Sequence, residues 1–188
     1  IIGLGNVGTG TLRILTESSA QIAQKLGFPL VLSMICSRSV ATREFPGLPA
    51  DIRRTAHWRE VIESPEIDIV AELIGGTTTA SEIIESAIGS GKSVVTANKE
   101  LMAQRGAEIW DRAIQSRVNL AMEASVAGGI PIHAVLREGI SGDRISALYG
   151  ILNGTSNYIL SEIEKHGSAF DSVLGEAQRL GYAEADPS

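Results

Sequence analysis

Cysteine, histidine and aromatic residues are all scarce in this chain of 188 residues, which holds one cysteine, three histidines and 4% aromatic residues. The single cysteine, Cys36, excludes an internal disulfide framework and fits a reducing compartment, so the cytoplasm is the expected location. Three scattered histidines and one cysteine cannot be assembled into a zinc-binding spacing. Disulfide-rich secreted scaffolds and structural zinc centres are therefore not expected.

Basic clusters and long apolar runs are also missing. Lys and Arg number 16 against 22 Asp and Glu, and the net charge is −6. Sequence-independent binding of nucleic acid needs clustered basic residues, and here only Arg53-Arg54 form a doublet. No apolar run approaches the roughly 20 residues that a membrane helix needs. The chain also opens on Ile1-Ile2, inside an expected strand, rather than on a signal peptide. We expect neither nucleic acid nor a membrane as a partner.

Hydrophobic residues make up 44% of the chain, which is enough for a packed core. Strand-like and helix-like segments alternate, a pattern typical of a parallel sheet covered by helices. For residues 1–122 we predict a Rossmann-type, doubly wound parallel α/β sheet. The expected elements are a first strand at residues 1–2, a helix from Gly8 to Leu26, strands at 30–36, 67–73, 93–96 and 119–122, and helices at 58–63, 81–88 and 101–116.

The pattern changes beyond residue 123, where we expect a second domain to begin and to run to residue 188. A glycine-rich turn at 126–131 precedes a predicted helix at 133–138, a strand at 145–152, and helices at 158–165 and 173–180. The chain stops at Asp186-Pro187-Ser188 without a closing element. We therefore expect the sequence to be part of a longer protein.

A G-x-G-x-x-G motif occupies residues 3–8, between the first strand and a strongly periodic helix. In a dinucleotide-binding fold the first glycine permits a tight turn, the second lets the backbone approach the pyrophosphate, and the third lets helix and strand pack closely. The N-terminus of the following helix attracts phosphate. The motif predicts a dinucleotide site, with a purely structural turn as the alternative; the cofactor-binding candidates are Gly3, Gly5, Asn6, Val7 and Gly8.

The end of the second strand bears on the choice between NAD and NADP. NAD-specific sites usually place Asp or Glu there, to bind the ribose 2′-hydroxyl. In this chain the strand runs from Cys36 into Ser37, Arg38 and Ser39, and no acid follows until Glu44. A guanidinium and hydroxyl groups suit a 2′-phosphate, which favours NADP. The alternative is that Arg38 is a solvated loop residue. Cys36 itself is interpreted as a buried strand residue rather than a nucleophile.

Two further strand ends fall where open α/β sheets bind ligands, at the carboxyl ends of the strands. The first carries Gly75 and Thr77, and its small residues leave room for the nicotinamide ribose. The second carries Lys99, directly after a buried strand. A lysine is usually solvated surface, but this position favours a functional role.

Five blocks together resemble the homoserine dehydrogenases: residues 3–8, 94–99 (VVTANK), 123–132 (EASVAGGIPI), 150–160 (GILNGTSNYIL) and 180–187 (LGYAEADP). The resemblance implies NAD(P)-dependent interconversion of L-homoserine and L-aspartate 4-semialdehyde, run physiologically towards homoserine for threonine, methionine and isoleucine synthesis. It also implies that residues 123–188 begin an α+β substrate and dimerisation domain, and that the enzyme is a homodimer.

The resemblance assigns roles to single residues. Lys99 would be a catalytic residue that contacts cofactor and substrate, with Gly181 beside the cofactor. Thr155 and Glu184 would bind the substrate, Glu184 through its amino group. A monovalent cation, expected to be sodium, would be bound by the Glu123 side chain and by the backbone carbonyl groups of Val126, Gly128 and Ile130. From spacing alone, this last block reads instead as a helix-entry turn with a surface glutamate.

One departure from the family pattern concerns catalysis. The family's second essential lysine and a substrate-binding Asp follow shortly after the block that ends at Pro187, and the chain stops at Ser188. The chain as given is therefore expected to be inactive. A related NAD(P) oxidoreductase and a non-catalytic nucleotide-sensing module are the alternatives. Aspartate-semialdehyde dehydrogenase is disfavoured because its cysteine nucleophile lies in the substrate domain, whereas Cys36 is in the second strand.

Overall fold

The computed structural model describes residues 1–42, 45, 48, 52–150 and 154–183. The chain divides into two compact units, residues 1–141 and 142–188, and each is described by itself. This division does not test the domain boundary predicted after residue 122, because compactness alone does not mark where a cofactor-binding domain ends.

The first unit is built on short parallel strands. Their bounds are β1 Met34–Cys36, β2 Arg53–Thr55, β3 Ile69–Glu72, β4 Ser93–Thr96 and β5 Leu120–Ala121. β1 pairs with β2, and β3, β4 and β5 pair in that order. Ile2 joins the two groups, because it forms parallel bridges with both Cys36 and Glu72. If Ile2 is counted as the first strand, the strands follow the Rossmann order 3-2-1-4-5-6.

Backbone hydrogen bonds on both sides of Ile2 hold the two groups of strands together. On one side the Ile2 amide donates to the Ala71 carbonyl over 2.8 Å, and the Leu73 amide donates to the Ile2 carbonyl over 2.8 Å. On the other side the Cys36 amide donates to the Ile1 carbonyl over 2.8 Å. The point at which the strand order reverses therefore lies directly at the glycine motif.

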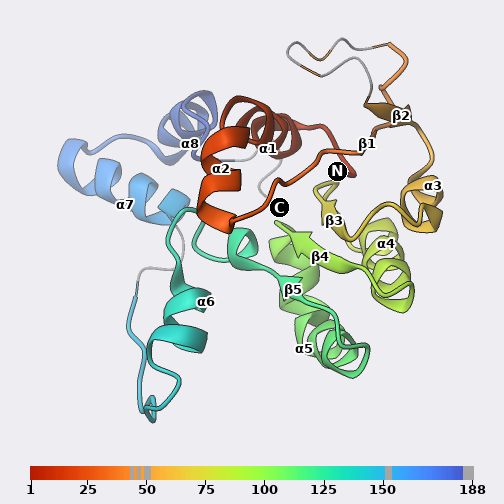
Figure 1. The fold of residues 1–188 in the computed structure, drawn as a ribbon. Coiled ribbons are helices and arrows are strands. Elements are labelled where there is room, and N and C mark those ends of the chain that lie inside the picture. Colours follow the sequence, from red (N-terminus) through yellow and green to blue (C-terminus); the bar gives the residue numbers. More distant parts are fainter. Residues whose placement is uncertain (43–44, 46–47, 49–51, 151–153, 184–188) are drawn as a thin grey trace. The chain divides into compact units, whose positions relative to one another are not determined.

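Helices of the first unit contribute to two separate hydrophobic clusters. Consecutive residues Ile1 and Ile2 belong to different clusters, as expected for side chains on opposite faces of a strand. One cluster includes residues of α3 to α5 and the other includes Leu12 and Leu15 of α1. The helices, labelled in Figure 1, are α1 Asn6–Glu17, α2 Ser19–Leu26, α3 Trp58–Glu63, α4 Thr78–Gly89 and α5 Lys99–Gln115.

After β5 the chain becomes irregular. A 3-10 turn, η1, spans Glu123–Ser125, and a short helix, α6, spans Ile132–Ala134. A π-helical turn, η2, follows at Val135–Gly139. The helix predicted at 133–138 is therefore present but is mostly π-helical.

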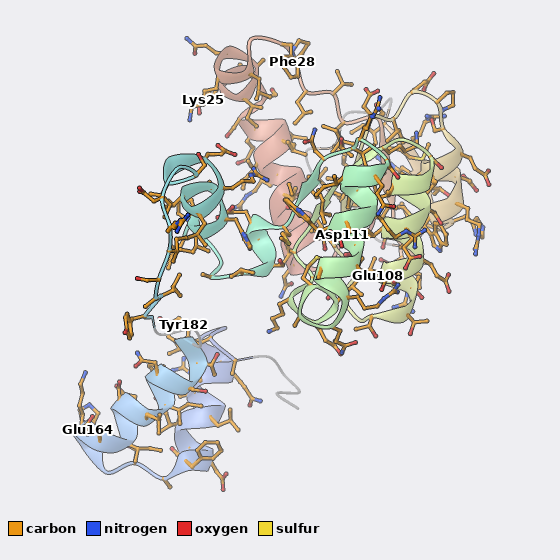
Figure 2. All side chains as sticks on the ribbon, turned by 90° about the horizontal axis from the view of Figure 1, so that it is seen from below. Lys25, Phe28, Glu108, Asp111, Glu164 and Tyr182 are labelled. Atoms are coloured by element: carbon orange, nitrogen blue, oxygen red, sulfur yellow. The ribbon has the colours of Figure 1, made fainter. Side chains whose placement is uncertain are left out.

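The second unit is a pair of helices, α7 Gly154–His166 and α8 Phe170–Arg179. Ile159 of α7 and Val173 and Ala177 of α8 are buried. The rings of Tyr158 and Tyr182 meet edge to face, with centroids 5.2 Å apart. Tyr182 is labelled on this unit in Figure 2 together with Glu164. Both predicted helices of this region are confirmed, with longer bounds at their N-terminal ends.

Three sequence-based predictions need correction. The helix expected from Gly8 to Leu26 is two helices, because the backbone leaves helical geometry at Ser18, in a Ser18-Ser19 pair. The strand expected at 30–36 is reduced to β1, whose three residues pair with β2, and residues 30–33 lie outside this paired segment. The strand expected at 145–152 is absent over residues 145–150, which have no paired neighbour in the described chain; residues 151–152 lie outside the described part.

Candidate functional site

The glycine loop has the backbone that a dinucleotide site requires. Gly3 has a φ of 99°, and a Cβ atom there would lie 2.5 Å from the Leu73 carbonyl oxygen. A Cβ atom at Gly8 would lie 1.9 Å from the Gly3 carbonyl oxygen. The tight turn and the close packing of helix against strand expected for the first and third glycines are therefore present. A Cβ atom at Gly5 would meet no atom within 4 Å, so this side of the loop is open.

The N-terminus of α1 opens directly from this loop. Gly5 is the residue before the first helical turn, no side chain caps the helix, and the first turn contains no acidic residue. The first N–H groups of an α-helix have no partner within the helix, and they attract anions. Neither a side-chain cap nor an acidic residue in the first turn of α1 competes with a bound phosphate.

A pocket of about 230 Å³ lies at this end of the sheet. Its lining comes from the start of α1, from the end of β3 and from the segment after β4: Gly5, Asn6, Val7, Glu72, Leu73, Ile74, Gly75, Ala97 and Asn98. These segments meet at the carboxyl ends of the strands, beside the switch point, where open α/β sheets bind ligands. The structure thus brings together four of the predicted cofactor residues, with Gly3 and Gly8 shaping the loop behind them.

A larger hollow of about 510 Å³ involves Met34, Arg53, Ser64 and their neighbours. It is lined by Met34, the first residue of β1, and by all three residues of β2, and it includes none of the residues that follow β1, β3 and β4. Parallel sheets bind ligands at the carboxyl ends of their strands, so the place of a pocket on the sheet is a better guide to the ligand site than its volume. The smaller pocket is the candidate site.

Glu72 is the most deeply buried charged group at this pocket, and the sequence-based reasoning missed it. Its side chain is fully buried at the last position of β3. One carboxylate oxygen accepts from the Ile74 amide over 2.9 Å, and the other accepts from the Thr96 hydroxyl over 2.7 Å. The available signal was a glutamate inside the otherwise apolar segment 69–74, where a buried strand ordinarily carries no charge.

Asn98 was missed as well, although it borders Lys99. Its side-chain oxygen accepts from the Leu101 amide over 3.1 Å and so caps α5, while its side-chain nitrogen donates to the Gly76 carbonyl over 2.6 Å. Lys99 is the first residue of α5 and is exposed, one residue beyond the pocket lining. Thr77 occupies the capping position of α4 and is half-buried, also outside the lining.

Arg38 lies in the turn that follows β1, at the same edge of the sheet. Its side chain is exposed. The flanking serines shape the turn: the Ser37 and Ser39 hydroxyls lie 3.0 Å apart, and the Ser39 amide donates to the Ser37 hydroxyl over 3.3 Å. Cys36 is buried, as predicted, and burial raises the pKa of its thiol. A raised pKa leaves less of the thiol as the nucleophilic thiolate, which favours the structural interpretation of Cys36.

Glu123 joins η1 to α6. Its two carboxylate oxygens accept from the backbone amides of His133 and Ala134, over 3.0 and 3.1 Å. In the segment between Glu123 and His133, the backbone is left-handed at Ala127, with a φ of 49°, and at Gly129, with a φ of 83°. A non-glycine residue in this region is uncommon and often marks a functional turn. In the described residues, no group of three His, Cys, Asp or Glu side chains could hold a metal ion. Any cation here would therefore depend on backbone oxygens such as those of Val126, Gly128 and Ile130.

The remaining predicted residues lie in the second unit. The Thr155 hydroxyl donates to the Tyr182 carbonyl, and Gly181 adopts a left-handed backbone with a φ of 78°. Glu184 lies outside the described residues. These residues belong to the second unit, which is described by itself.

Among the described helices, none is both long and apolar enough to cross a membrane.

Two family models cover most of the chain. One, described as homoserine dehydrogenase, NAD binding domain, matches residues 3–123, and the other, described as homoserine dehydrogenase, matches residues 131–188. The homoserine dehydrogenase of Pseudomonas aeruginosa is 46% identical over 191 residues, covering 100% of this chain and 43% of that protein. The homoserine dehydrogenase of Bacillus subtilis is 40% identical over 188 residues, again covering 100% of this chain and 43% of the relative.

Solved structures agree with the sequence comparisons. A homoserine dehydrogenase from Thiobacillus denitrificans superimposes with a TM-score of 0.88 at 49% identity, covering 99% of this chain and 43% of that one. A hyperthermophilic archaeal homoserine dehydrogenase mutant in complex with NADPH gives a TM-score of 0.78 at 27% identity, covering 100% of this chain and 62% of that one.

The chain spans less than half the length of these bacterial relatives. Within that span, the cofactor-binding family model covers well over half of the chain, and the glycine loop and switch-point pocket lie inside the matched residues. The chain belongs to the homoserine dehydrogenase family.

Proposed function

We propose that the full protein is a homoserine dehydrogenase, which interconverts L-homoserine and L-aspartate 4-semialdehyde with NAD(P) in the synthesis of threonine, methionine and isoleucine. The observation that carries this proposal is a pocket at the switch point of a Rossmann-ordered sheet, in a chain of this family. Relatives that bear this name are 40–46% identical over the whole chain.

The pocket suits a dinucleotide. Gly5 leaves open space over the uncapped N-terminus of α1, where a pyrophosphate fits, and Gly75 offers a backbone without a side chain beside it. The bound nicotinamide supplies the hydride acceptor or donor, and the protein must hold it against the substrate carbon. We further propose NADP as the preferred form, because Arg38 and two serines follow β1 where NAD-specific sites usually carry an acid.

Lys99 is proposed as a catalytic residue. It begins α5 next to Asn98, which lines the pocket, so its ammonium group can reach a ligand at this edge. In the oxidation of an alcohol, a proton must leave the hydroxyl group as the hydride is transferred, and a lysine side chain can accept or position it. The family's second lysine, expected beyond Ser188, would share this task, so the chain as given is predicted to bind cofactor without turnover.

The block around Glu123 is proposed to hold a monovalent cation, expected to be sodium. The carboxylate accepts two backbone N–H groups and keeps further lone pairs, and hard oxygen ligands suit such an ion. The left-handed residues Ala127 and Gly129 reverse the chain between the carbonyl groups of Val126, Gly128 and Ile130, which are the other proposed ligands.

Residues 123–188 are proposed to begin an α+β domain for substrate binding and dimerisation, with Thr155 and Glu184 as substrate contacts and Gly181 beside the cofactor. The Thr155 hydroxyl and the turn at Gly181 and Tyr182 are already linked within this unit, which supports their belonging to one site. A homodimer in the cytoplasm is part of the same proposal.

The test is to express the complete gene product and to follow nicotinamide absorbance with L-homoserine, using NAD⁺ and NADP⁺ in parallel. Homoserine-dependent reduction supports the proposal, and L-aspartate serves as the control substrate. If the protein binds the cofactor but does not oxidise homoserine, the homoserine dehydrogenase assignment fails, and a related NAD(P) oxidoreductase or a nucleotide-sensing module takes its place.

A further inference from the structure

We propose that Glu72 is a positioning residue. Its buried carboxylate links the end of β3 to the end of β4, and so fixes the Gly75–Gly76 turn relative to Lys99 at the start of α5. This inference rests on the proposed function for its catalytic consequence. Its structural basis is independent, because it concerns which groups line the pocket and how they are joined.

The first link fixes the turn after β3. Glu72 is fully buried, and its carboxylate accepts the amide of Ile74 two residues further on. Ile74 precedes Gly75 and Gly76, which both have left-handed backbones with φ of 75° and 70°. Two consecutive glycines in this region have many alternative conformations, so the turn needs an outside anchor. The Glu72 carboxylate supplies this anchor at the rim of the pocket.

The second link runs sideways to the neighbouring strand. The other Glu72 oxygen accepts from the Thr96 hydroxyl, and the Thr96 oxygen in turn accepts from the Asn98 amide over 3.1 Å. Thr96 is itself fully buried. A hydroxyl group can donate one hydrogen bond and also accept, so Thr96 links the Glu72 carboxylate to the segment that leads into α5.

The third link closes the circuit. The Asn98 side chain donates to the Gly76 carbonyl and accepts from the Leu101 amide. Asn98 therefore connects the turn after β3 with the first turn of α5, which begins at Lys99. Glu72, Thr96 and Asn98 form a closed loop of hydrogen bonds around the pocket edge, here called the strand-end loop.

A structural purpose alone does not require an acid at this position. A buried carboxylate costs free energy unless it is well hydrogen-bonded, and an apolar residue would suit this buried position at the end of β3 better. Lys92, at the opposite end of β4, is a buried charge with a purely structural role. Its ammonium group donates to the carbonyls of Ser64 and Ile67, over 2.7 and 2.6 Å, and it is not part of the pocket lining. The two buried charges make a matched pair for experiment.

The conservative variant separates geometry from charge. In Glu72→Gln, the side-chain oxygen can still accept from the Ile74 amide, while the side-chain nitrogen donates to the Thr96 oxygen. The strand-end loop can therefore survive without the negative charge. In Glu72→Ala both links are lost, and the Ile74 amide and the Thr96 hydroxyl lose their buried partner.

The experiment uses the complete gene product and measures kcat, KM for homoserine, Kd for NADPH by fluorescence, and Tm. For Glu72→Ala we expect kcat to fall about 100-fold, the cost typical of a small misplacement of reacting groups. The Kd for NADPH should rise, with little change in KM for homoserine. Glu72→Gln should recover most of kcat. Lys92→Met should lower Tm as much as Glu72→Ala and leave kcat and the Kd unchanged.

Several results would overturn the proposal. One is a Glu72→Ala enzyme with normal kcat and normal Kd. Another is a Glu72→Gln enzyme as impaired as the alanine variant, since the charge and not the geometry would then matter. If Glu72→Ala does not fold, Thr96→Val cuts the loop at its second link, and an unchanged kcat in that variant also overturns it. If the wild-type protein does not oxidise homoserine, the proposed function fails, and the Kd for NADPH still decides the role of Glu72.

Discussion

Gly8 faces the carbonyl oxygen of Gly3 so closely that a single methyl group at Gly8 would stand 1.9 Å from it. No real Cβ atom tolerates that distance, and the obstructing atom is backbone that cannot rotate away. The first turn of α1 and the strand segment that ends at Gly3 can approach each other only while residue 8 is glycine. Gly5, two residues beyond Gly3 in the same motif, has no atom within 4 Å of the equivalent position.

Gly8→Ala and Gly5→Ala should therefore fail in different ways. We expect Gly8→Ala to lose at least about 3 kcal/mol of unfolding free energy, the upper end of the usual cost of overpacking. Gly5→Ala should fold normally and bind NADPH at least tenfold more weakly, because its methyl group occupies the proposed pyrophosphate space. Denaturant unfolding measures the loss of stability, and NADPH titration measures the loss of affinity.

Gly10→Ala, in open space within α1, is the control and should gain about 0.5–1 kcal/mol from helix propensity. A Gly5→Ala variant with normal affinity would exclude Gly5 from the cofactor site.

Arg38→Ala should weaken NADP⁺ binding and leave NAD⁺ binding unchanged. A charge-assisted contact to the 2′-phosphate contributes about 1.5–3 kcal/mol, so Kd for NADP⁺ should rise about 10- to 100-fold. Isothermal titration with both nucleotides gives the two Kd values. Arg54→Ala, in β2, serves as the control for loss of one positive charge. Equal weakening of both nucleotides would contradict the assignment of Arg38 to the 2′-phosphate.

Lys99→Ala should reduce turnover of the complete enzyme while the fold is retained. General acid–base groups contribute about 10²- to 10⁴-fold, so kcat should fall within that range. Lys25→Ala, near the end of α2 (Figure 2), removes an exposed charge outside the pocket and should leave kcat unchanged. Near-normal turnover in Lys99→Ala would remove this lysine from the mechanism.

Glu85 should make part of the stability depend on pH. Burial raises the pKa of its carboxyl group, but the hydrogen bond from Ser81 and the charges of Arg112 and Arg105 outweigh it, so the pKa is lowered. A carboxyl group whose pKa is lower in the folded state contributes stability above its unfolded pKa, and this contribution disappears as the pH falls through the folded value. The ion pairs join α4 to α5.

We expect Glu85→Gln to cost about 1 kcal/mol at pH 7, because both arginines are partly exposed and water screens the ion pairs. Relative to wild type, the deficit should shrink as the pH falls below about 4.3, the usual glutamate pKa. Urea unfolding at several pH values measures it. Glu82→Gln, on the exposed side of α4, is the control and should show no deficit at any pH. A Glu85→Gln deficit that stays constant down to pH 2 would contradict the linkage.

Local sequence pattern was sufficient for the elements that are bounded by strong signals. The predicted bounds of α3 and β4 match those observed, since Ser64-Pro65 ends one and Gly91 precedes the other. Gly27, with a φ of 81°, ends α2 as expected. The turn geometry of Gly3 and Gly8 was also predictable, because a G-x-G-x-x-G motif between strand and helix leaves few alternatives.

Features that depend on a distant partner were not predictable in the same way. β1 is defined by its pairing with β2, nearly twenty residues further along the chain, and residues 145–150, predicted to be part of a strand, have no paired neighbour among the described residues. Glu72 illustrates the same limit at the site, because its importance comes from Thr96 on another strand. The roles of Lys99, Arg38 and Glu123 stay predictions, since they concern ligands.

The bridge at Ile2 has a consequence for local opening of the sheet. The amide protons of Cys36 and Leu73 lie in different halves of the sheet, yet their acceptors are the carbonyls of Ile1 and Ile2. Fraying of this one short segment would expose both amides to solvent together, so they should exchange with deuterium as a single cooperative unit. The glycine loop follows Ile2 directly. The hydrogen-exchange protection of the Cys36 and Leu73 amides therefore reports how often the segment that carries the glycine loop opens.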